Sequence, residues 1–362
     1  MQSFDSSGIR KMFEMAAKLK DPINLSIGEP DFPIPAPVKA ALIEAIQNDR
    51  TTYAPTQGIA ALREALLQRV LQELGQPERK LLVTSGTSGG LLLALLAVLN
   101  PGDEVILFDP YFVMYDALVK LVGGVVRTVS TYPNFQPDVA QVAAAITPRT
   151  KMIIVNSPCN PTGVCWSQET LAAVAQLARE RGICLVSDEI YRDFSYDQPH
   201  VRPAEYNPET LVIDGFSKSH AMTGLRLGFA HGPAELIEAM IKLQQFTFVC
   251  APHPVQYAGI AALQTPVVHL TEAYRRKRDL LVEQLSPQFQ LVAPGGAFFA
   301  FAQAPWGNGE EFVTAAIENN VLVIPGKVFS RRDTHFRISF AVADERLATG
   351  IAILNRLAER GA

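Results

Sequence analysis

A lysine in the second half of the chain is the residue best suited to covalent chemistry. Lys218 follows the apolar run at residues 211–213, which is predicted to be a strand. Eight residues later, Arg226 stands between two glycines, which allow the backbone to come close to a ligand. A lone lysine is more often a solvated surface charge, but a guanidinium beside it is a planar match for phosphate. An imine-forming amine next to an anion site points to pyridoxal phosphate.

A glycine-rich and serine-rich stretch supplies a second place for an anion. Residues 85–90 join a predicted strand to an apolar helix. The backbone N–H groups and hydroxyls of Gly86, Thr87 and Ser88 can hold a phosphate at the positive end of that helix. An ordinary turn is equally compatible with this composition. It is not a Walker loop, because the lysine that such a loop requires is missing.

Two more polar residues follow predicted strands. Asp188 comes directly after the run at residues 183–187, and a carboxylate buried there needs a cation. The protonated nitrogen of a pyridine ring is one such cation, although a helix cap or an ion pair with Arg192 is the more usual fate of an aspartate. Asn160 lies in an Asn-Pro-Thr-Gly turn after the run at residues 151–156, where it can face a ligand or only form the turn.

One arginine and two aromatic residues complete the candidate site. Arg337 lies in the apolar strand pattern at residues 336–340, where a charge must be paired or face a cleft. It can bind a substrate carboxylate through two hydrogen bonds, or form an internal ion pair. Tyr111 and Phe112 are core aromatics by default, but one of them can cover the face of a flat ring.

The elements that would position these residues alternate between strands and helices. Strands are predicted at residues 80–84, 104–108, 125–129, 151–156, 183–187 and 210–213, and helices at residues 90–99, 113–122 and 170–181. Strands that are apolar on both faces belong in a mainly parallel sheet with helices on both sides. The predicted fold class is therefore α/β, with ligands at the carboxyl ends of the strands.

The two ends of the chain have a different pattern, which predicts a second domain. Helices are predicted at residues 7–19, 38–48, 270–285 and 345–359, and strands at residues 289–292, 298–301, 321–324 and 336–340. We expect residues 1–32 and 266–362 to form a small α/β domain that closes over the active site. Residues 33–265 would form the large cofactor-binding domain, and a ligand pocket is common at such a boundary.

The composition excludes several classes of protein. With 362 residues and 48% hydrophobic composition, the chain can bury a large core. A net charge of −4 with scattered lysines and arginines gives no footprint for nucleic acid or a membrane surface. The longest apolar run, residues 91–99, is too short to span a bilayer, and no signal peptide begins the chain, so a cytoplasmic location is expected. The four cysteines lack metal-ligand spacing, so no metal site is expected.

Over nearly its whole length the chain resembles the class I and II aminotransferases of the fold-type I pyridoxal-phosphate enzymes. The most specific matches are Ser217–Gly228, Asn160–Gly163, Ser187–Tyr191 and Tyr53–Gly58. They are most similar to the branch with aromatic and broad-range aminotransferases. The resemblance implies a large domain with a sheet of the seven-stranded type and a smaller domain built from both termini.

The resemblance also implies roles around the ring of pyridoxal 5′-phosphate. Lys218 would form the aldimine and carry the proton, and Asp188 would pair with the ring nitrogen. Tyr191 and Asn160 would donate hydrogen bonds to the ring oxygen. Phe112 would stack on the ring face.

Further roles concern the phosphate and the substrate. The phosphate would be held by Gly86, Thr87, Ser88, Ser217 and Arg226. Tyr53 would reach the phosphate of the neighbouring subunit, which implies a homodimer. Arg337, Asn160 and the backbone of Gly28 would hold the α-carboxylate of the substrate.

The expected reaction moves an amino group from an L-amino acid, aromatic or acidic, to a 2-oxo acid such as 2-oxoglutarate. One alternative is a cysteine-S-conjugate β-lyase on the same scaffold, and another is a binding or regulatory protein without activity. The intact Lys218, Asp188 and Arg226 weigh against the second of these. Departures from the family pattern at Gly215, Leu225, Ser330 and residues 301–311 concern the side-chain pocket and leave the donor open.

Overall fold

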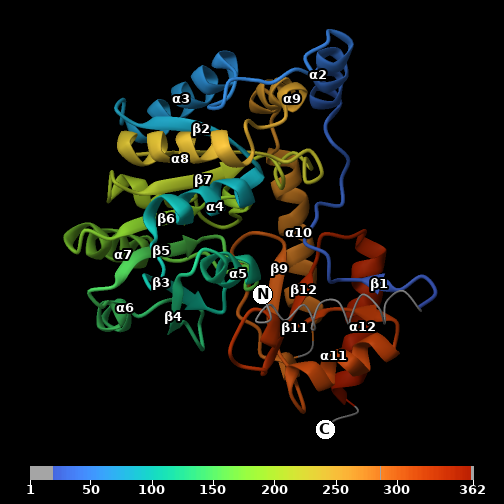
Figure 1. Ribbon diagram of the computed structural model, residues 1–362. Helices are drawn as coiled ribbons and strands as arrows, with labels where there is room; N and C mark the ends of the chain where they lie inside the picture. Colours follow the sequence, from blue (N-terminus) through green and yellow to red (C-terminus); the bar gives the residue numbers. More distant parts are fainter. Residues whose placement is uncertain (1–18, 286, 360–362) are drawn as a thin grey trace.

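A seven-stranded sheet forms the centre of the computed structural model, which describes residues 19–285 and 287–359 (Figure 1). Its strands are β2 (Lys80–Ser85), β3 (Glu104–Asp109), β4 (Val125–Ser130), β5 (Thr150–Asn156), β6 (Cys184–Asp188), β7 (Leu211–Gly215) and β8 (Leu227–Gly232). Their order across the sheet is β2-β8-β7-β6-β5-β3-β4. All neighbours are parallel except β8, which runs antiparallel to both β2 and β7. The predicted α/β class and the seven-stranded type of sheet are confirmed.

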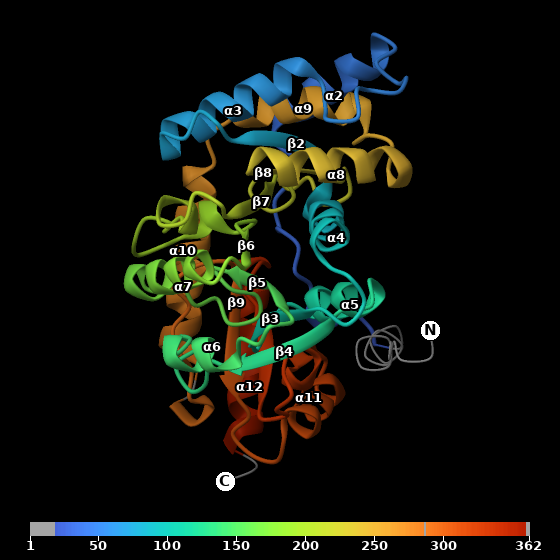
Figure 2. The same cartoon turned by 60° about the vertical axis from the view of Figure 1, so that its left-hand side comes forward.

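Helices cover both faces of this sheet because successive strand residues point to opposite sides. They are α2 (Ala36–Gln47), α3 (Ala60–Leu74), α4 (Gly86–Val98), α5 (Val113–Leu121), α6 (Val139–Ala145), α7 (Gln168–Glu180), α8 (Ala234–Thr247) and α9 (His253–Leu263). In β3, for example, Val105 and Leu107 join one hydrophobic cluster with α4, and Ile106 joins another with α7. Figure 2 shows α4 and α5 on one side of the strands and α6 and α7 on the other.

A smaller unit packs beside the sheet and contains segments from both ends of the chain. Its strands are β1 (Ile23–Asn24), β9 (Phe299–Gln303), β10 (Val321–Leu322), β11 (Ile324–Pro325) and β12 (His335–Ser339), and its helices are α10 (Val268–Gln284), α11 (Gly309–Glu318) and α12 (Asp344–Glu359). β1 pairs with β10 in parallel, while β12 lies between β11 and β9. Fully buried phenylalanines at 298, 299, 312 and 336 fill its core.

The smaller unit depends on contacts between residues far apart in the sequence, such as the pairing of Ile23 with Val321. After β1 the chain runs as an extended segment to α2, which packs on α9 at the far side of the sheet (Figure 1). The division at residues 32/33 and 265/266 stays a prediction. Residues 1–18, including most of the helix predicted at residues 7–19, lie outside the described residues.

Three short segments differ from the sequence-based predictions. The strand predicted at residues 289–292 is wrong: Pro287–Phe289 form a 3-10 turn, and Leu291 makes only an isolated bridge to Ala302. The single strand predicted at residues 321–324 is divided into β10 and β11, which pair with different strands. β8 was not predicted, because its two glycines and one histidine hide the apolar pattern.

Short 3-10 helices complete the described structure at Arg192–Phe194, Pro203–Glu205 and Gly326–Val328. In the ranges that the structure describes, no helix combines the length and apolar composition needed to cross a bilayer.

Candidate active site

A cavity of about 390 Å³ lies where the sheet meets the smaller unit, a size typical of small-molecule sites. Of the predicted site residues, those that line it are Gly28, Thr87, Ser88, Phe112, Asn160, Asp188, Tyr191, Ser217, Lys218, Arg226 and Arg337. Asp188 ends β6, and Lys218 comes three residues after β7 ends. Because β8 is antiparallel, its first end reaches the same edge and brings Arg226 there. The fold thus gathers residues that are far apart in the sequence.

Lys218 is held inside this cavity as an amine with altered basicity. Its Nζ donates a hydrogen bond to the carbonyl of Gly28 at 2.7 Å. Burial lowers the pKa of the amine to about 8, while the Glu29 carboxylate opposes that shift and the charges of Arg337 and Arg226 add to it. A lowered pKa leaves more of the amine neutral near pH 7, and the neutral amine is the nucleophilic form.

Asp188 is a buried carboxylate, only 3% exposed. Its Oδ2 accepts a hydrogen bond from the hydroxyl of Tyr115 at 2.7 Å, and its Oδ1 accepts one from the Ile190 N–H at 3.3 Å. Burial raises the pKa of Asp188 to about 6, and the Tyr115 hydrogen bond partly offsets this. A cationic nitrogen placed beside such a carboxylate would favour its ionised form.

Tyr115 and Asn156 are site residues that the sequence reading missed. Asn156 donates to the Asp188 carbonyl at 3.0 Å and accepts from the Asn160 N–H at 2.9 Å. Tyr115 lies in α5 with the spacing of a core aromatic residue, so its pattern carried no separate signal. Asn156 did carry a signal, because it is the last residue of a strand that was predicted to end at the ligand-binding edge of the sheet.

The first turn of α4 and Arg226 bring hydrogen-bond donors together at one end of the cavity. α4 begins at Gly86, whose φ of +68° favours glycine, and no side chain caps its first N–H groups. The Arg226 guanidinium lies 3.4 Å from Ser88 Oγ. A Cβ on Gly86 would lie 2.6 Å from an Arg226 nitrogen, so this glycine makes room for the guanidinium without lining the cavity itself. Free N–H groups at a helix start beside a guanidinium suit a phosphate.

Arg337 is buried on β12 and reaches the cavity from the smaller unit. Its two terminal nitrogens donate to Asn160 Oδ1 at 2.9 Å and to the Ser26 carbonyl at 2.7 Å. The guanidinium packs against the rings of Phe299 and Phe329. Burial lowers its pKa to about 10, so it stays a cation at neutral pH.

The contacts of Arg337 bear on whether it binds a ligand carboxylate or forms an internal ion pair. Within residues 19–285 and 287–359, no carboxylate forms an ion pair with Arg337, and its buried Nε has no hydrogen-bond partner. A buried cation without an anion is costly unless a ligand supplies one. The geometry therefore favours a ligand carboxylate over an internal ion pair.

Of the remaining predicted residues, Tyr191 and Phe112 line the cavity, whereas Tyr111 and Tyr53 do not. Tyr191 is buried, and burial raises its pKa above the usual range while the Asn160 side chain opposes that shift. Of the two aromatic candidates, Phe112 lines the cavity and Tyr111 does not. Tyr53 lies outside this cavity and is 84% exposed.

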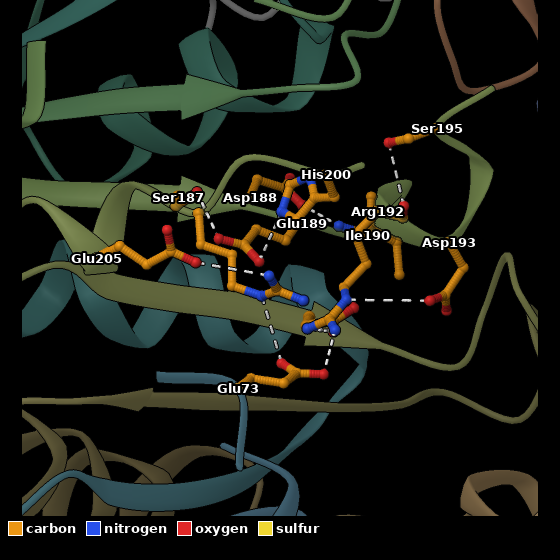
Figure 3. A network of polar contacts seen from close by, with 12 residues as sticks. Glu73, Ser187, Asp188, Glu189, Ile190, Arg192, Asp193, Ser195, His200 and Glu205 are labelled. Carbon is orange, nitrogen blue, oxygen red and sulfur yellow. Dashed lines mark hydrogen bonds and ion pairs between the residues drawn. The ribbon is translucent and has the colours of Figure 1, made fainter. Parts of the chain in front are cut away.

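A network of charged side chains supports the segment that follows β6 (Figure 3). Glu189 accepts from Ser187 Oγ at 3.0 Å, and its other oxygen lies 3.0 Å from His200 Nε2. Arg192 donates to Glu73 of α3, and its other terminal nitrogen lies 3.6 Å from Asp214 of β7. This network ties the segment that carries Asp188 and Tyr191 to the strand that leads to Lys218.

The donor set fits pyridoxal 5′-phosphate. An amine of lowered pKa, a buried carboxylate and a helix start with a guanidinium match the aldehyde, the ring nitrogen and the phosphate of that group. All three line one cavity.

Comparisons with known proteins agree with this geometry. The family model described as aminotransferase class I and II matches residues 20–354. The chain is 40% identical over 365 residues to a Thermus thermophilus protein named aspartate/prephenate aminotransferase, with 97% of this chain and 94% of that protein covered.

Solved structures give the same result. A Thermus thermophilus aspartate aminotransferase double mutant superimposes with a TM-score of 0.94 at 38% identity, covering 98% of both chains. An aromatic aminotransferase from Pyrococcus horikoshii gives a TM-score of 0.90 at 33% identity, covering 96% of this chain and 99% of that one.

Proposed function

This chain belongs to the class I and II aminotransferase family, whose members depend on pyridoxal phosphate, and we propose that it moves an amino group from an aromatic or acidic L-amino acid to a 2-oxo acid. The proposed acceptor is 2-oxoglutarate, as the resemblance implies. The observation that carries the proposal is the Lys218 amine of lowered pKa, in one cavity with Asp188 and the partly unpaired Arg337.

The proposed cofactor contacts rest on the resemblance, and all of their residues except Gly86 line the cavity. Those at the phosphate are Gly86, Thr87, Ser88, Ser217 and Arg226, and those at the ring are Phe112, Asn160, Asp188 and Tyr191. When bound, pyridoxal phosphate supplies an aldehyde that accepts the amino group and a ring that delocalises the electrons of the broken Cα–H bond. Asp188 supports that delocalisation by keeping the ring nitrogen protonated.

The proposed substrate contacts come from Arg337, Asn160 and Gly28, which line the same cavity. Arg337 would hold the α-carboxylate with its guanidinium, with Asn160 and the Gly28 backbone beside it. Fixing the carboxylate fixes which bond of Cα faces the Lys218 amine. The neutral Lys218 amine would take the proton from Cα as a general base.

A panel of L-amino acids mixed with the purified holoenzyme tests this function. The cofactor spectrum should convert to that of the amino form with at least one amino acid, and one equivalent of the matching 2-oxo acid should appear. A 2-oxo acid added next should restore the first spectrum and yield a new amino acid. Ammonia and pyruvate from a cysteine conjugate, with no amino acid formed from any pair, would instead support a β-lyase.

We also propose that the enzyme is a cytoplasmic homodimer in which Tyr53 reaches the phosphate of the neighbouring subunit. The Tyr53 side chain is 84% exposed in the single chain, which leaves it available to a partner.

A further inference from the structure

We infer that Tyr115 is a positioning residue that acts through Asp188. Its hydroxyl orients the carboxylate and keeps it ionised, so that a proton shared with the cofactor ring stays on the ring nitrogen. The inference rests on the proposed role of Asp188 and deepens it. An aspartate beside a pyridine nitrogen can form an ion pair, with the proton on nitrogen, or a neutral pair, with the proton on oxygen. Only the ion pair gives the ring the positive charge that makes it a good electron sink.

The carboxylate of Asp188 is held at both of its oxygens. Its Oδ2 accepts a hydrogen bond from the Tyr115 hydroxyl at 2.7 Å, and its Oδ1 accepts a longer one from the Ile190 N–H at 3.3 Å. The backbone is fixed as well, because Asp188 pairs with Asn156 of β5 and with Ile213 of β7. A carboxylate has about four lone-pair directions, so it can still accept a hydrogen bond from the cavity that it lines. The shorter contact, from Tyr115, therefore does most to orient the side chain.

The start of α5 and the core of the chain set Tyr115 in place. Tyr115 is only 3% exposed and belongs to the hydrophobic cluster that contains Leu107 and Val119. Its backbone N–H donates to the Phe112 carbonyl at 3.0 Å, and the two rings meet edge to face with their centroids 5.6 Å apart. One helix start thus fixes both the ring proposed to cover the cofactor and the hydroxyl that holds Asp188. Both contacts are made within one chain.

The hydrogen bond from Tyr115 bears on the charge of Asp188 because burial works against ionisation. Burial raises the pKa of Asp188 to about 6, whereas the Tyr115 hydroxyl and the charge of Lys218 oppose that shift. A hydrogen bond to a charged acceptor is stronger than one to a neutral acceptor, so it stabilises the ionised form selectively. Without it, the carboxylate would be a stronger base and would compete better with the ring nitrogen for the proton.

The other titratable groups around this pair leave the Tyr115 hydroxyl as the donor. Burial raises the pKa of Tyr115 well above its usual value, and the charges of Asp188, Cys159 and Tyr191 add to that shift. Burial also raises the pKa values of Cys159 and Tyr191, so both stay protonated at neutral pH. Burial would raise the pKa of Glu189, but its cationic neighbours lower it to about 2, so its charge is constant there.

The first test reads the position of the proton in holoenzyme that contains pyridoxal 5′-phosphate labelled with ¹⁵N at the ring nitrogen. The wild type should show the ¹⁵N chemical shift of a protonated ring. Tyr115→Phe keeps the ring contact with Phe112 and removes only the hydroxyl, so the shift should move toward that of an unprotonated ring. Tyr132→Phe removes another tyrosine hydroxyl, which donates to Ser330 Oγ at 3.0 Å outside this cavity, and should leave the shift unchanged. Equal shifts in the wild type and Tyr115→Phe would overturn the inference.

A double-mutant cycle tests whether Tyr115 acts through Asp188. Tyr115→Phe should lower kcat about tenfold, as expected for a change of one pKa unit in Asp188, and should change KM little. In an Asp188→Asn background the same substitution should lower kcat less than about twofold, because no carboxylate remains to be kept ionised. Equal losses in both backgrounds would mean that Tyr115 supports the site only through packing, which would also overturn the inference.

These measurements separate the inference from the proposed function. If no amino acid converts the cofactor, the transamination fails, but the ¹⁵N measurement still tests the inference. If Asp188→Asn keeps a protonated ring, the proposed role of Asp188 fails and the inference fails with it.

A second variant covers the case in which Tyr115→Phe does not fold. 3-Fluorotyrosine at position 115 is a stronger donor than tyrosine, so the Asp188 carboxyl of the cofactor-free chain should titrate at lower pH by ¹³C NMR. An unchanged titration would overturn the inference.

Discussion

The proposed reactivity of Lys218 and its cost to stability have the same origin, which is the burial of the amine. Burial lowers the pKa of the amine from 10.5 to about 8, so its charged form is less favourable in the folded protein than in the unfolded chain. The same shift makes the amine a better nucleophile near neutral pH. Active-site residues often destabilise a fold in this way.

Replacing Lys218 by methionine should therefore stabilise the cofactor-free protein. At pH 7 both the folded and unfolded amines are protonated, so the full penalty applies, and its removal should add about 1 to 3 kcal/mol to the free energy of unfolding. Between pH 8 and 10.5 the unfolded chain binds more protons, so wild-type stability should rise and the difference should shrink. Denaturant unfolding at several pH values measures it.

A matched control is Lys151→Met, which removes an exposed lysine at the start of β5 and should change stability little at any pH. A Lys218→Met protein that is less stable than wild type at pH 7 would contradict the explanation. So would a difference that does not depend on pH.

Sequence reasoning located the residues that project from strand ends and missed those whose role depends on packing. Lys218, Asp188 and Asn160 follow apolar runs, and parallel strands bring their carboxyl ends to one edge. Tyr115 looks like any core aromatic residue of a helix, and only the fold shows its hydroxyl 2.7 Å from Asp188. The free Nε of Arg337 likewise depends on which carboxylates are absent nearby, which no linear pattern reports.

At the scale of elements, Arg192 joins three parts of the large unit. It lies in the turn after β6 and contacts Glu73 of α3 and Asp214 of β7. Its side chain is only 9% exposed and that of Asp214 is 5% exposed, so the two charges are mostly shielded from water. Burial raises the pKa of Asp214 to about 7, and Arg192 opposes that shift.

At pH 8, Arg192→Met should lower the free energy of unfolding by about 3 kcal/mol, because it leaves the buried Asp214 carboxylate without its cation and removes one cation from Glu73. The double variant Arg192→Met/Asp214→Asn should recover at least about 1 kcal/mol of that loss, since the unpaired charge is then removed. A double-mutant cycle in denaturant measures the coupling. Strictly additive effects would mean that the two side chains do not interact, and Lys120→Met, at an exposed ion pair with Asp116 outside this network, serves as the comparison.

The elements that the sequence predicted well are those with a continuous apolar pattern. β8 was not predicted because its glycines interrupt the apolar pattern. Glycine is required at position 228, since a Cβ there would lie 2.7 Å from the Gly86 carbonyl carbon. The apolar run at residues 321–324 looks like one strand, but its two halves pair with β1 and β12. Pairing partners depend on tertiary contacts, which the run itself does not encode.

At the scale of the molecule, the proposed site is shared between two chains. Tyr53 lies outside the cavity of its own chain, so in the proposed dimer it serves the partner. Active sites that use residues of two subunits require a fixed interface between them.

Two inactive variants can test this sharing. Lys218→Ala and Tyr53→Asp should each be inactive as homodimers. Refolded together in equal amounts, they should regain about one quarter of wild-type activity, because half of the dimers are mixed and each mixed dimer has one intact site. If Tyr53 served its own chain, both sites of a mixed dimer would be defective and activity would stay at the level of the single variants.

The parallel pairing of β1 with β10 also fixes the order in which parts of the protein can fold during translation. Ile23 leaves the ribosome early, but its partner Val321 emerges close to the end of synthesis. The proposed cofactor contacts within one chain lie between residues 86 and 226 and can assemble first, as the large sheet folds. Gly28 and Arg337, the two sides of the proposed carboxylate site, meet only afterwards. A nascent chain can thus hold its cofactor before it can hold a substrate.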